Sequence, residues 1–184
     1  MSRAAFAPGS TAFLDRDGTI NESAPEGEYI TSASEIRLIP GAAEAIRLLN
    51  ELPAKVVVVT NQRGIALGKM SEADLTAVNE RLVLELDREG AHLDAIFHCP
   101  HAAGSCDCRK PCPGMFERAA REVPGVRIEG GAMIGDSALD VEAGLRLGLT
   151  TVRIGASKVE DPTPTRETVD LLAAARWLLG DVHN

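Results

Sequence analysis

The sequence has little positive charge, few aromatic residues and no long hydrophobic run. Its formal net charge of −8 argues against nucleic acid or an anionic membrane as the main partner, because both require a basic face. No apolar run approaches the roughly 20 residues of a membrane span, and the segment Met1–Gly9 lacks the apolar stretch of a signal peptide. We therefore expect a soluble, cytoplasmic protein that binds neither nucleic acid nor membranes.

The length of the chain predicts one domain over residues 1–184. A chain of 184 residues can bury roughly 70% of the surface that its unfolded form exposes, so it needs no disulfide framework. We see no internal repeat, no linker and no second domain, and we expect a monomer. The chain is long enough to build a catalytic site on a conventional core.

Hydrophobic patterns alternate between strands and helices along the chain. Strands are predicted at Thr11–Asp15, Lys55–Thr60, Leu93–His98, Ala132–Ile134 and Thr150–Ile154. Helices are predicted at Gly41–Leu52, Ser71–Glu89, Pro113–Glu122, Leu139–Leu147 and Val169–Leu179. Apolar residues have helical spacing in the first two of these helices, and Ser71 with Asp74 resembles a capping box. The spaced residues are Ala42, Ala45, Ile46 and Leu49, then Leu75, Val78, Leu82 and Leu86. This alternation predicts an α/β fold with a doubly wound, mostly parallel sheet and helices on both faces.

Polar side chains suited to binding a phosphate stand at the ends of three predicted strands. Asp15 and Asp17 follow the first strand, Thr60 and Asn61 end the second, and Asp136 follows the fourth. Ligands of open α/β sheets bind beyond the carboxyl ends of the strands, so these side chains should converge. The carboxylates repel a phosphate unless a hard cation with oxygen ligands lies between them, and Mg²⁺ is the obvious candidate.

Four separate blocks of sequence resemble the motifs of the haloacid dehalogenase superfamily of phosphatases. The blocks are Phe13–Asn21, Val59–Gln62, Arg109–Pro111, and Ile134–Ser137 with Asp140. The resemblance implies the Rossmann-like fold of that superfamily, and the sequence contains no obvious insertion for a large cap domain.

The resemblance also implies a role for each matching residue. Asp15 would be the nucleophile that forms an aspartyl-phosphate, and Asp17 the general acid and then the base. Mg²⁺ would lie on Asp15, on the backbone carbonyl of Asp17 and on Asp136. Thr60 and Lys110 would hold the phosphoryl oxygens.

The four cysteines all lie between Cys99 and Cys112, which suits a metal site in a reducing compartment. The predicted zinc ligands are Cys99, His101, Cys106 and Cys108, in a loop at about residues 98–112. A site with four protein ligands is closed to water, so we expect structural Zn²⁺. We exclude His98 and Cys112 as ligands. The loop leads directly into Arg109 and Lys110, so the metal would position that lysine.

The zinc loop resembles that of the heptose-1,7-bisphosphate 7-phosphatase and histidinol-phosphatase branch of the superfamily. This resemblance implies removal of the 7-phosphate from D-glycero-D-manno-heptose 1,7-bisphosphate. We expect Arg63 and Arg109 to contact a second anionic group on the substrate, because guanidinium pairs with phosphate in planar, bidentate geometry. Ser137 departs from the lysine common in the heptose enzymes. Asp140 is expected to orient the metal end or Lys110, or to be an ordinary aspartate in the first turn of a helix.

Two alternatives to this function stay open. A histidinol-phosphate phosphatase, or another small-molecule phosphomonoesterase, uses the same chemistry. A signalling module could instead use Asp15 as a phosphoacceptor, although such a module needs no zinc loop.

Overall fold

The fold is organised around a six-stranded sheet, seen in a computed structural model that describes residues 6–180. Residues 1–5 lie outside this range, and they belong to the segment Met1–Gly9, for which we predicted no signal peptide. The strands are β1 (Thr11–Leu14), β2 (Lys55–Asn61), β3 (Ala95–Cys99), β4 (Ala132–Gly135), β5 (Thr150–Ile154) and β6 (Arg166–Thr168). They lie in the order β3-β2-β1-β4-β5-β6, and every pair is parallel. The carboxyl ends of the central strands therefore meet at one edge.

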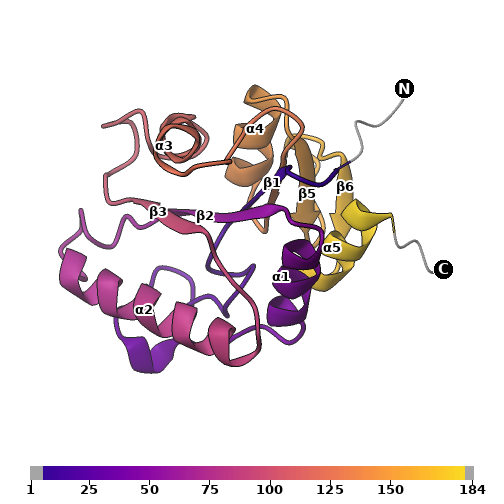
Figure 1. Cartoon of the computed structure of the whole chain (residues 1–184). Coiled ribbons are helices and arrows are strands. Elements are labelled where there is room, and N and C mark those ends of the chain that lie inside the picture. The colour runs from indigo at the N-terminus through magenta and orange to yellow at the C-terminus, as the bar shows by residue number, and fades with distance from the viewer. Residues whose placement is uncertain (1–5, 181–184) are drawn as a thin grey trace.

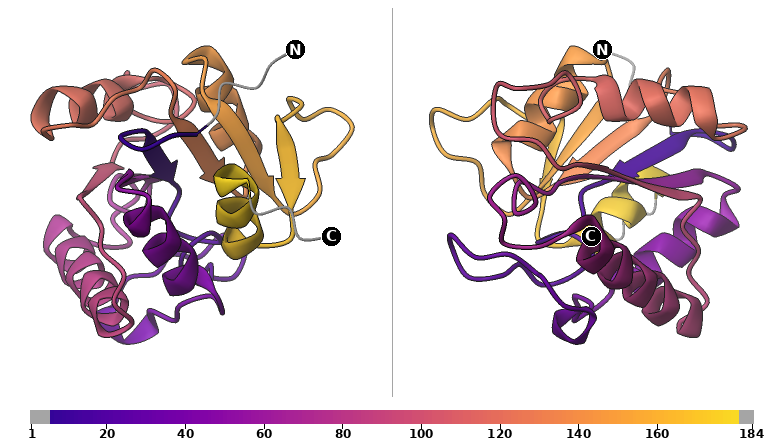
Figure 2. Two further views of the ribbon diagram at one scale, coloured as in Figure 1. Left: turned by 45° about the vertical axis from the view of Figure 1, so that its right-hand side comes forward. Right: turned by 90° about the vertical axis from the view of Figure 1, so that its left-hand side faces the viewer.

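Helices cover both faces of the sheet, as the alternating pattern predicted. They are α1 (Ala42–Glu51), α2 (Glu72–Arg88), α3 (Gly114–Glu122), α4 (Ala138–Arg146) and α5 (Leu171–Leu179), with a short 3₁₀ turn η1 at Ala33–Glu35. Figure 1 shows α3 and α4 on one face, with α1, α2 and α5 on the other. The side views in Figure 2 show the same three layers, which confirms the doubly wound fold.

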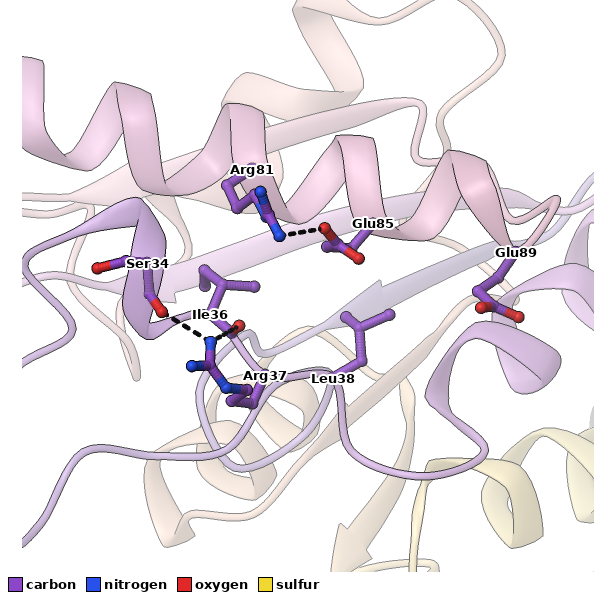
Figure 3. A pocket seen from close by; sticks show the side chains of 7 residues that line it. All are labelled: Ser34, Ile36, Arg37, Leu38, Arg81, Glu85 and Glu89. Atoms are coloured by element: carbon purple, nitrogen blue, oxygen red, sulfur yellow. Dashed lines mark hydrogen bonds and ion pairs between the residues drawn. The ribbon is translucent and has the colours of Figure 1, made fainter.

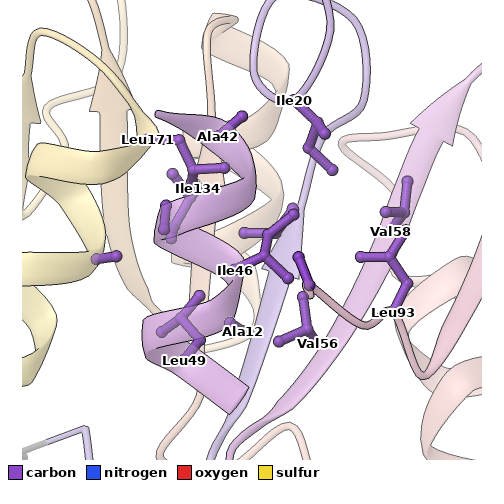
Figure 4. Close-up of a cluster of buried hydrophobic side chains, with 14 of the residues drawn as sticks. Ala12, Ile20, Ala42, Ile46, Leu49, Val56, Val58, Leu93, Ile134 and Leu171 are labelled. Atoms are coloured by element: carbon purple, nitrogen blue, oxygen red, sulfur yellow. The ribbon is translucent and has the colours of Figure 1, made fainter. Parts of the chain in front are cut away.

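The core has one layer on each side of the sheet, because successive strand residues point to opposite faces. On the face of α1, α2 and α5, Val56 and Val58 pack with Ile46, as Figure 4 shows. On the opposite face, Phe13 packs with Phe116 of α3 at a ring-centroid distance of 5.0 Å. Strands buried on both faces explain the run of consecutive valines in β2.

The helices bury the residues that their spacing predicted. In α1 these are Ala42, Ala45, Ile46 and Leu49, and in α2 they are Leu75, Val78, Leu82 and Leu86. The predicted capping box at the start of α2 is present, with Ser71 and Asp74 bonding to each other's backbone N–H groups. Among residues 6–180, no helix has the length and apolar character needed to cross a membrane.

Two short elements were not predicted. Strand β6 is an edge strand of three residues, Arg-Glu-Thr, in a segment for which we predicted neither a strand nor a helix. It carries no apolar alternation, and its backbone pairing with β5 alone defines it. The 3₁₀ turn η1 lies in the irregular stretch before α1 and buries no residue.

Candidate active site

The predicted convergence of strand ends occurs at the carboxyl edge of β2, β1 and β4. Carboxylate oxygens of Asp15, Asp136 and Asp140 lie within 4.8 Å of one another. The turn after β1 approaches this cluster closely at Gly18, which has a φ of +79°. A Cβ on Gly18 would lie 2.1 Å from Oδ2 of Asp136, so only glycine allows this approach.

Lys110 joins two of these carboxylates. Its Nζ donates to Oδ1 of Asp15 at 2.8 Å and to Oδ1 of Asp140 at 2.6 Å, and its side chain is only 2% exposed. Burial alone lowers the pKa of Lys110, but the charges of Asp140 and Asp15 outweigh it and raise the pKa. The lysine is therefore a fixed positive charge beside the predicted nucleophile.

The acidic groups at this edge are held in an unfavourable electrostatic environment. Burial raises the pKa of Asp15 to about 7, with further increases from the charges of Asp140 and Asp17 that Lys110 partly offsets. Burial also raises the pKa of Asp136, again with help from the charge of Asp140. Such groups are stabilised by a cation, so the pKa shifts mark this cluster as a candidate functional site.

Asp140 combines the two roles that the sequence left open. It lies in the first turn of α4, where Oδ2 accepts from the Ser137 hydroxyl at 2.6 Å and from the Ser137 N–H at 3.0 Å. Its other oxygen, Oδ1, accepts a hydrogen bond from Nζ of Lys110. Ser137 thus caps the helix and fixes Asp140, which in turn fixes Lys110.

Asp17 lies in a separate hydrogen-bond network. Oδ1 accepts from Arg16 Nε at 3.1 Å and from Asn21 Nδ2 at 2.9 Å. Oδ2 accepts from Arg16 Nη2 at 2.9 Å and from Gln62 Nε2 at 2.9 Å. Gln62 also donates to Oγ1 of Thr60 at 2.9 Å, which connects Asp17 to the end of β2. Sequence reasoning gave Arg16 and Gln62 no role, although both lie inside the matching motifs.

The side-chain amide of Asn61 holds the backbone of Lys110 in place. Its Nδ2 donates to the carbonyl of Lys110 at 3.2 Å, and its Oδ1 accepts from the N–H of Lys110 at 3.0 Å. Both ends of the amide are therefore engaged with the loop that precedes α3. The predicted contact of Asn61 with a phosphate stays a prediction.

The two predicted arginines differ in their surroundings. Arg63 follows β2 and is exposed. Arg109 is half-buried, and its Nη1 is buried without a hydrogen-bond partner. An unpaired buried guanidinium nitrogen is costly, so Arg109 has a donor available for an anion.

The predicted zinc ligands form one cluster at the end of β3. The sulfur atoms of Cys99, Cys106 and Cys108 lie 3.2 to 3.5 Å apart, and Nδ1 of His101 lies 3.2 Å from Cys108 Sγ. Burial raises the pKa of the Cys99 thiol. At Cys106, burial is outweighed by hydrogen bonds, the largest contribution coming from Cys108, and the pKa falls to about 7.

The two residues that we excluded as zinc ligands lie outside this cluster. Nε2 of His98 is 2.9 Å from a carboxylate oxygen of Glu72 on α2, so the ring points elsewhere. Cys112 is a half-buried free thiol.

Comparison with known proteins identifies the family. Residues 5–148 match the family model described as haloacid dehalogenase-like hydrolase. The chain belongs to this family. Two relatives named D-glycero-beta-D-manno-heptose-1,7-bisphosphate 7-phosphatase are similar to it. The protein from Pseudomonas putida is 39% identical over 90% of this chain and 97% of its own length. The protein from Rhodopseudomonas palustris is 38% identical over 81% of this chain and 85% of its own.

A solved structure is similar over nearly the whole chain. It is the D,D-heptose 1.7-bisphosphate phosphatase from B. bronchiseptica complexed with magnesium and phosphate. The TM-score is 0.81 at 33% identity, covering 94% of this chain and 99% of the other. The haloacid dehalogenase-like fold predicted from the sequence is therefore confirmed.

The residues of this haloacid dehalogenase-like hydrolase suit both expected metals. Three carboxylates with oxygens within 4.8 Å are hard ligands for Mg²⁺, and Lys110 already occupies one oxygen of Asp140. Three sulfurs and one imidazole nitrogen suit Zn²⁺. Zinc bonded to sulfur at about 2.3 Å sets tetrahedral sulfurs about 3.8 Å apart, so the cluster needs only a small expansion.

A cavity of about 620 Å³ between α2 and the segment containing Ser34 is a different feature (Figure 3). Three of its four charged side chains have partners, because Arg81 bonds to Glu85 at 2.6 Å and Arg37 donates to the backbone carbonyls of Ser34 and Ile36; the fourth is Glu89. None of the predicted catalytic residues lines this cavity. The candidate active site is therefore the carboxylate edge of the sheet.

Proposed function

We propose that this haloacid dehalogenase-like hydrolase is a Mg²⁺-dependent phosphomonoesterase that converts D-glycero-β-D-manno-heptose 1,7-bisphosphate to the 1-phosphate. The observation that carries the chemistry is the buried Lys110 between Asp15 and Asp140, beside Asp136. The names of the relatives support the choice of substrate. Histidinol phosphate is the rival substrate, but a cationic imidazole would need a carboxylate where this chain has Arg109.

The first half of the reaction is the transfer of the phosphoryl group to the protein. The carboxylate of Asp15 attacks phosphorus, and the bond from phosphorus to the sugar oxygen breaks. Asp17 gives its proton to the departing oxygen. Lys110 and the hydroxyl of Thr60 hold the phosphoryl oxygens. Mg²⁺ held by Asp15 and Asp136 would supply further positive charge to them.

The second half returns the protein to its starting state. Asp17, now ionised, takes a proton from a water molecule that attacks the phosphorus of the aspartyl-phosphate. The bond from phosphorus to Asp15 breaks and inorganic phosphate leaves. Asp17 is then protonated again, so one carboxyl group serves both steps.

Arg109 is proposed to bind the phosphate at C1, which is not hydrolysed. Its unpartnered Nη1 supports this assignment, because a phosphate would supply the missing acceptor. Arg63 is exposed and is proposed as a weaker contact of the same kind. Each contact would lower KM for a bisphosphate relative to a monophosphate.

The zinc loop is proposed to be structural. Cys99, at the end of β3, and Cys108, shortly before Lys110, belong to one cluster, so bound Zn²⁺ would fix the loop that carries the lysine. We also propose that the protein acts as a single-domain monomer in the cytoplasm, where thiols remain reduced.

The test is phosphate release in the presence of Mg²⁺ from a matched panel. The panel contains both anomers of the heptose bisphosphate, histidinol phosphate and a 3′-phosphorylated oligonucleotide. We expect kcat/KM for the β anomer to exceed the values for the other compounds by at least about 10²-fold, which corresponds to about 2.7 kcal/mol. A preference for histidinol phosphate, or uniformly low rates, would contradict the proposed substrate. No Mg²⁺-dependent release from any phosphate ester would contradict the phosphatase itself.

A further inference from the structure

We propose that Arg16, anchored by Asn79 of α2, is a positioning residue that aims the carboxyl group of Asp17 at the leaving oxygen. This inference rests on the proposed phosphatase function, in which Asp17 is the general acid. It adds two residues to the site, one of which lies 63 positions away in the sequence.

The arginine is buried and has a partner for each of its three nitrogens. Its side chain is 0% exposed, which is rare for arginine. Nε and Nη2 grip both oxygens of Asp17 at 3.1 and 2.9 Å, and Nη1 donates to Oδ1 of Asn79 at 2.9 Å. The guanidinium is therefore held from both sides, by the turn after β1 and by helix α2.

Burying a guanidinium is expensive unless its partners compensate for the lost water. The described hydrogen bonds of Arg16 give it one carboxylate, Asp17, and one neutral amide, Asn79. An ion pair at the surface would join arginine to aspartate without the cost of burying the guanidinium. The arrangement instead fixes the plane of the Asp17 carboxylate, because a two-point contact with a rigid fork prevents rotation of the acceptor.

The remaining donors to Asp17 are neutral. Asn21 and Gln62 each donate one amide hydrogen bond to it, at 2.9 Å in both cases. The two-point contact with Arg16 is charge-assisted, so it is the strongest of the contacts that orient this carboxyl group.

Substrates with different leaving groups distinguish a positioning role of Arg16 from a general disruption of the site. An alkoxide needs a proton to leave, whereas p-nitrophenolate does not, so only alkyl phosphates depend on Asp17 as an acid. The parameter kcat/KM reports the transfer to Asp15 and excludes the later hydrolysis. We therefore compare kcat/KM for the sugar phosphate that the wild type hydrolyses best with kcat/KM for p-nitrophenyl phosphate.

Two variants weaken the contact between Arg16 and Asp17, one at Arg16 itself and one at its anchor Asn79. Arg16→Lys keeps the charge but cannot grip both oxygens of Asp17. Asn79→Leu removes the outer anchor, and Asn79 lines a cavity of about 450 Å³ that leaves room for the substituted side chain. We expect kcat/KM for the sugar phosphate to fall about 10²-fold in Arg16→Lys and about tenfold in Asn79→Leu, with less than about a threefold fall for p-nitrophenyl phosphate.

Val78→Ala is the matched control, because Val78 is fully buried next to Asn79 in α2 but has no role in the network. It should lower Tm and leave the ratio of the two kcat/KM values unchanged. Equal losses on both substrates in Arg16→Lys and Asn79→Leu, or no loss in either, would overturn the inference while leaving the proposed function intact. A wild type that hydrolyses neither ester would contradict the proposed function itself, and with it the inference.

Discussion

The ammonium group of Lys110 lies 2.8 Å from Oδ1 of Asp15, the carboxylate proposed to attack phosphorus. The two residues are 95 positions apart, and the loop after the zinc ligands brings them together. The side chain of Asp15 is 13% exposed, so water can screen this contact only in part. Lys110 thus offsets part of the repulsion between the carboxylates before any substrate arrives.

Replacing Lys110 should show this double role. In Lys110→Met, the carboxylate of Asp140 stays 1% exposed without its cation. We expect a loss of about 3–5 kcal/mol in the free energy of unfolding and a fall in kcat of at least about 10²-fold. Added Mg²⁺ should restore part of the stability but not the activity. Chemical unfolding and phosphate release measure the two effects.

The control for this variant is Lys55→Met. Lys55 pairs with Asp94 at 2.6 Å at the start of β2, but it is more exposed and lies at the opposite end of the strand from Thr60. Its loss should cost less stability and leave kcat unchanged. If the two variants lose similar stability and Lys110→Met keeps its activity, Lys110 has no part in the reaction.

Replacing Asp15, the proposed nucleophile, should separate catalysis from folding. Asp15→Asn keeps the size of the side chain and removes a buried charge that repels Asp140. We expect turnover to fall by more than about 10⁴-fold, with a Tm equal to or above that of the metal-free wild type. Mass spectrometry after rapid acid quench should detect a phosphorylated wild type and no phosphorylated variant. Appreciable hydrolysis by a clean preparation of the variant would remove Asp15 from this role.

Much of this fold could be predicted from local patterns, because the buried positions repeat with the period of each element. Helix α2 buries the apolar residues that its spacing of three and four selected, and it begins at the predicted cap, Ser71. Strand β6 could not be predicted, because Arg166–Thr168 is a polar edge strand defined only by backbone pairing with β5.

Part of the candidate active site was also predictable from local patterns. The positions of Asp15 and Asp136 follow from motifs at the ends of parallel strands, whereas Lys110, in the loop after β3, was identified from its resemblance to a family motif. The network around Asp17 is different, because arginine is usually exposed and nothing in the local sequence marks Arg16 as buried. Its partner Asn79 lies on the half-buried side of a helix, and only the packing of α2 brings the two residues together.

The zinc loop offers a comparison between two cysteines. Cys106→Ser removes one of the four clustered ligands, whereas Cys112→Ser changes a thiol outside the cluster. We expect Cys106→Ser to lose bound zinc, to melt at a lower temperature and to lose activity, because the loop carries Lys110. Cys112→Ser should match the wild type in zinc content, Tm and kcat. Elemental analysis and thermal melting test both, and unchanged zinc in Cys106→Ser would exclude Cys106 as a ligand.

The pH dependence of magnesium binding should report on Asp15, the proposed nucleophile. Burial raises the pKa of Asp15 from 3.8 to about 7 in the metal-free protein. Between these values the folded state binds a proton that the unfolded state has lost, so Asp15 makes folding less favourable as pH rises through this window.

Mg²⁺ binds the ionised carboxylate and must displace that proton, so it should raise Tm little near about pH 5 and progressively more up to about pH 7. Above about pH 8 the increment should be constant, because Asp15 is then ionised before the metal binds. Melting curves with and without Mg²⁺ across this range measure the increment. Asp15→Asn is the control, since it lacks the titrating group and should lose most of the pH dependence. A Tm increment that is the same at every pH in the wild type would show that proton release from Asp15 is not linked to metal binding.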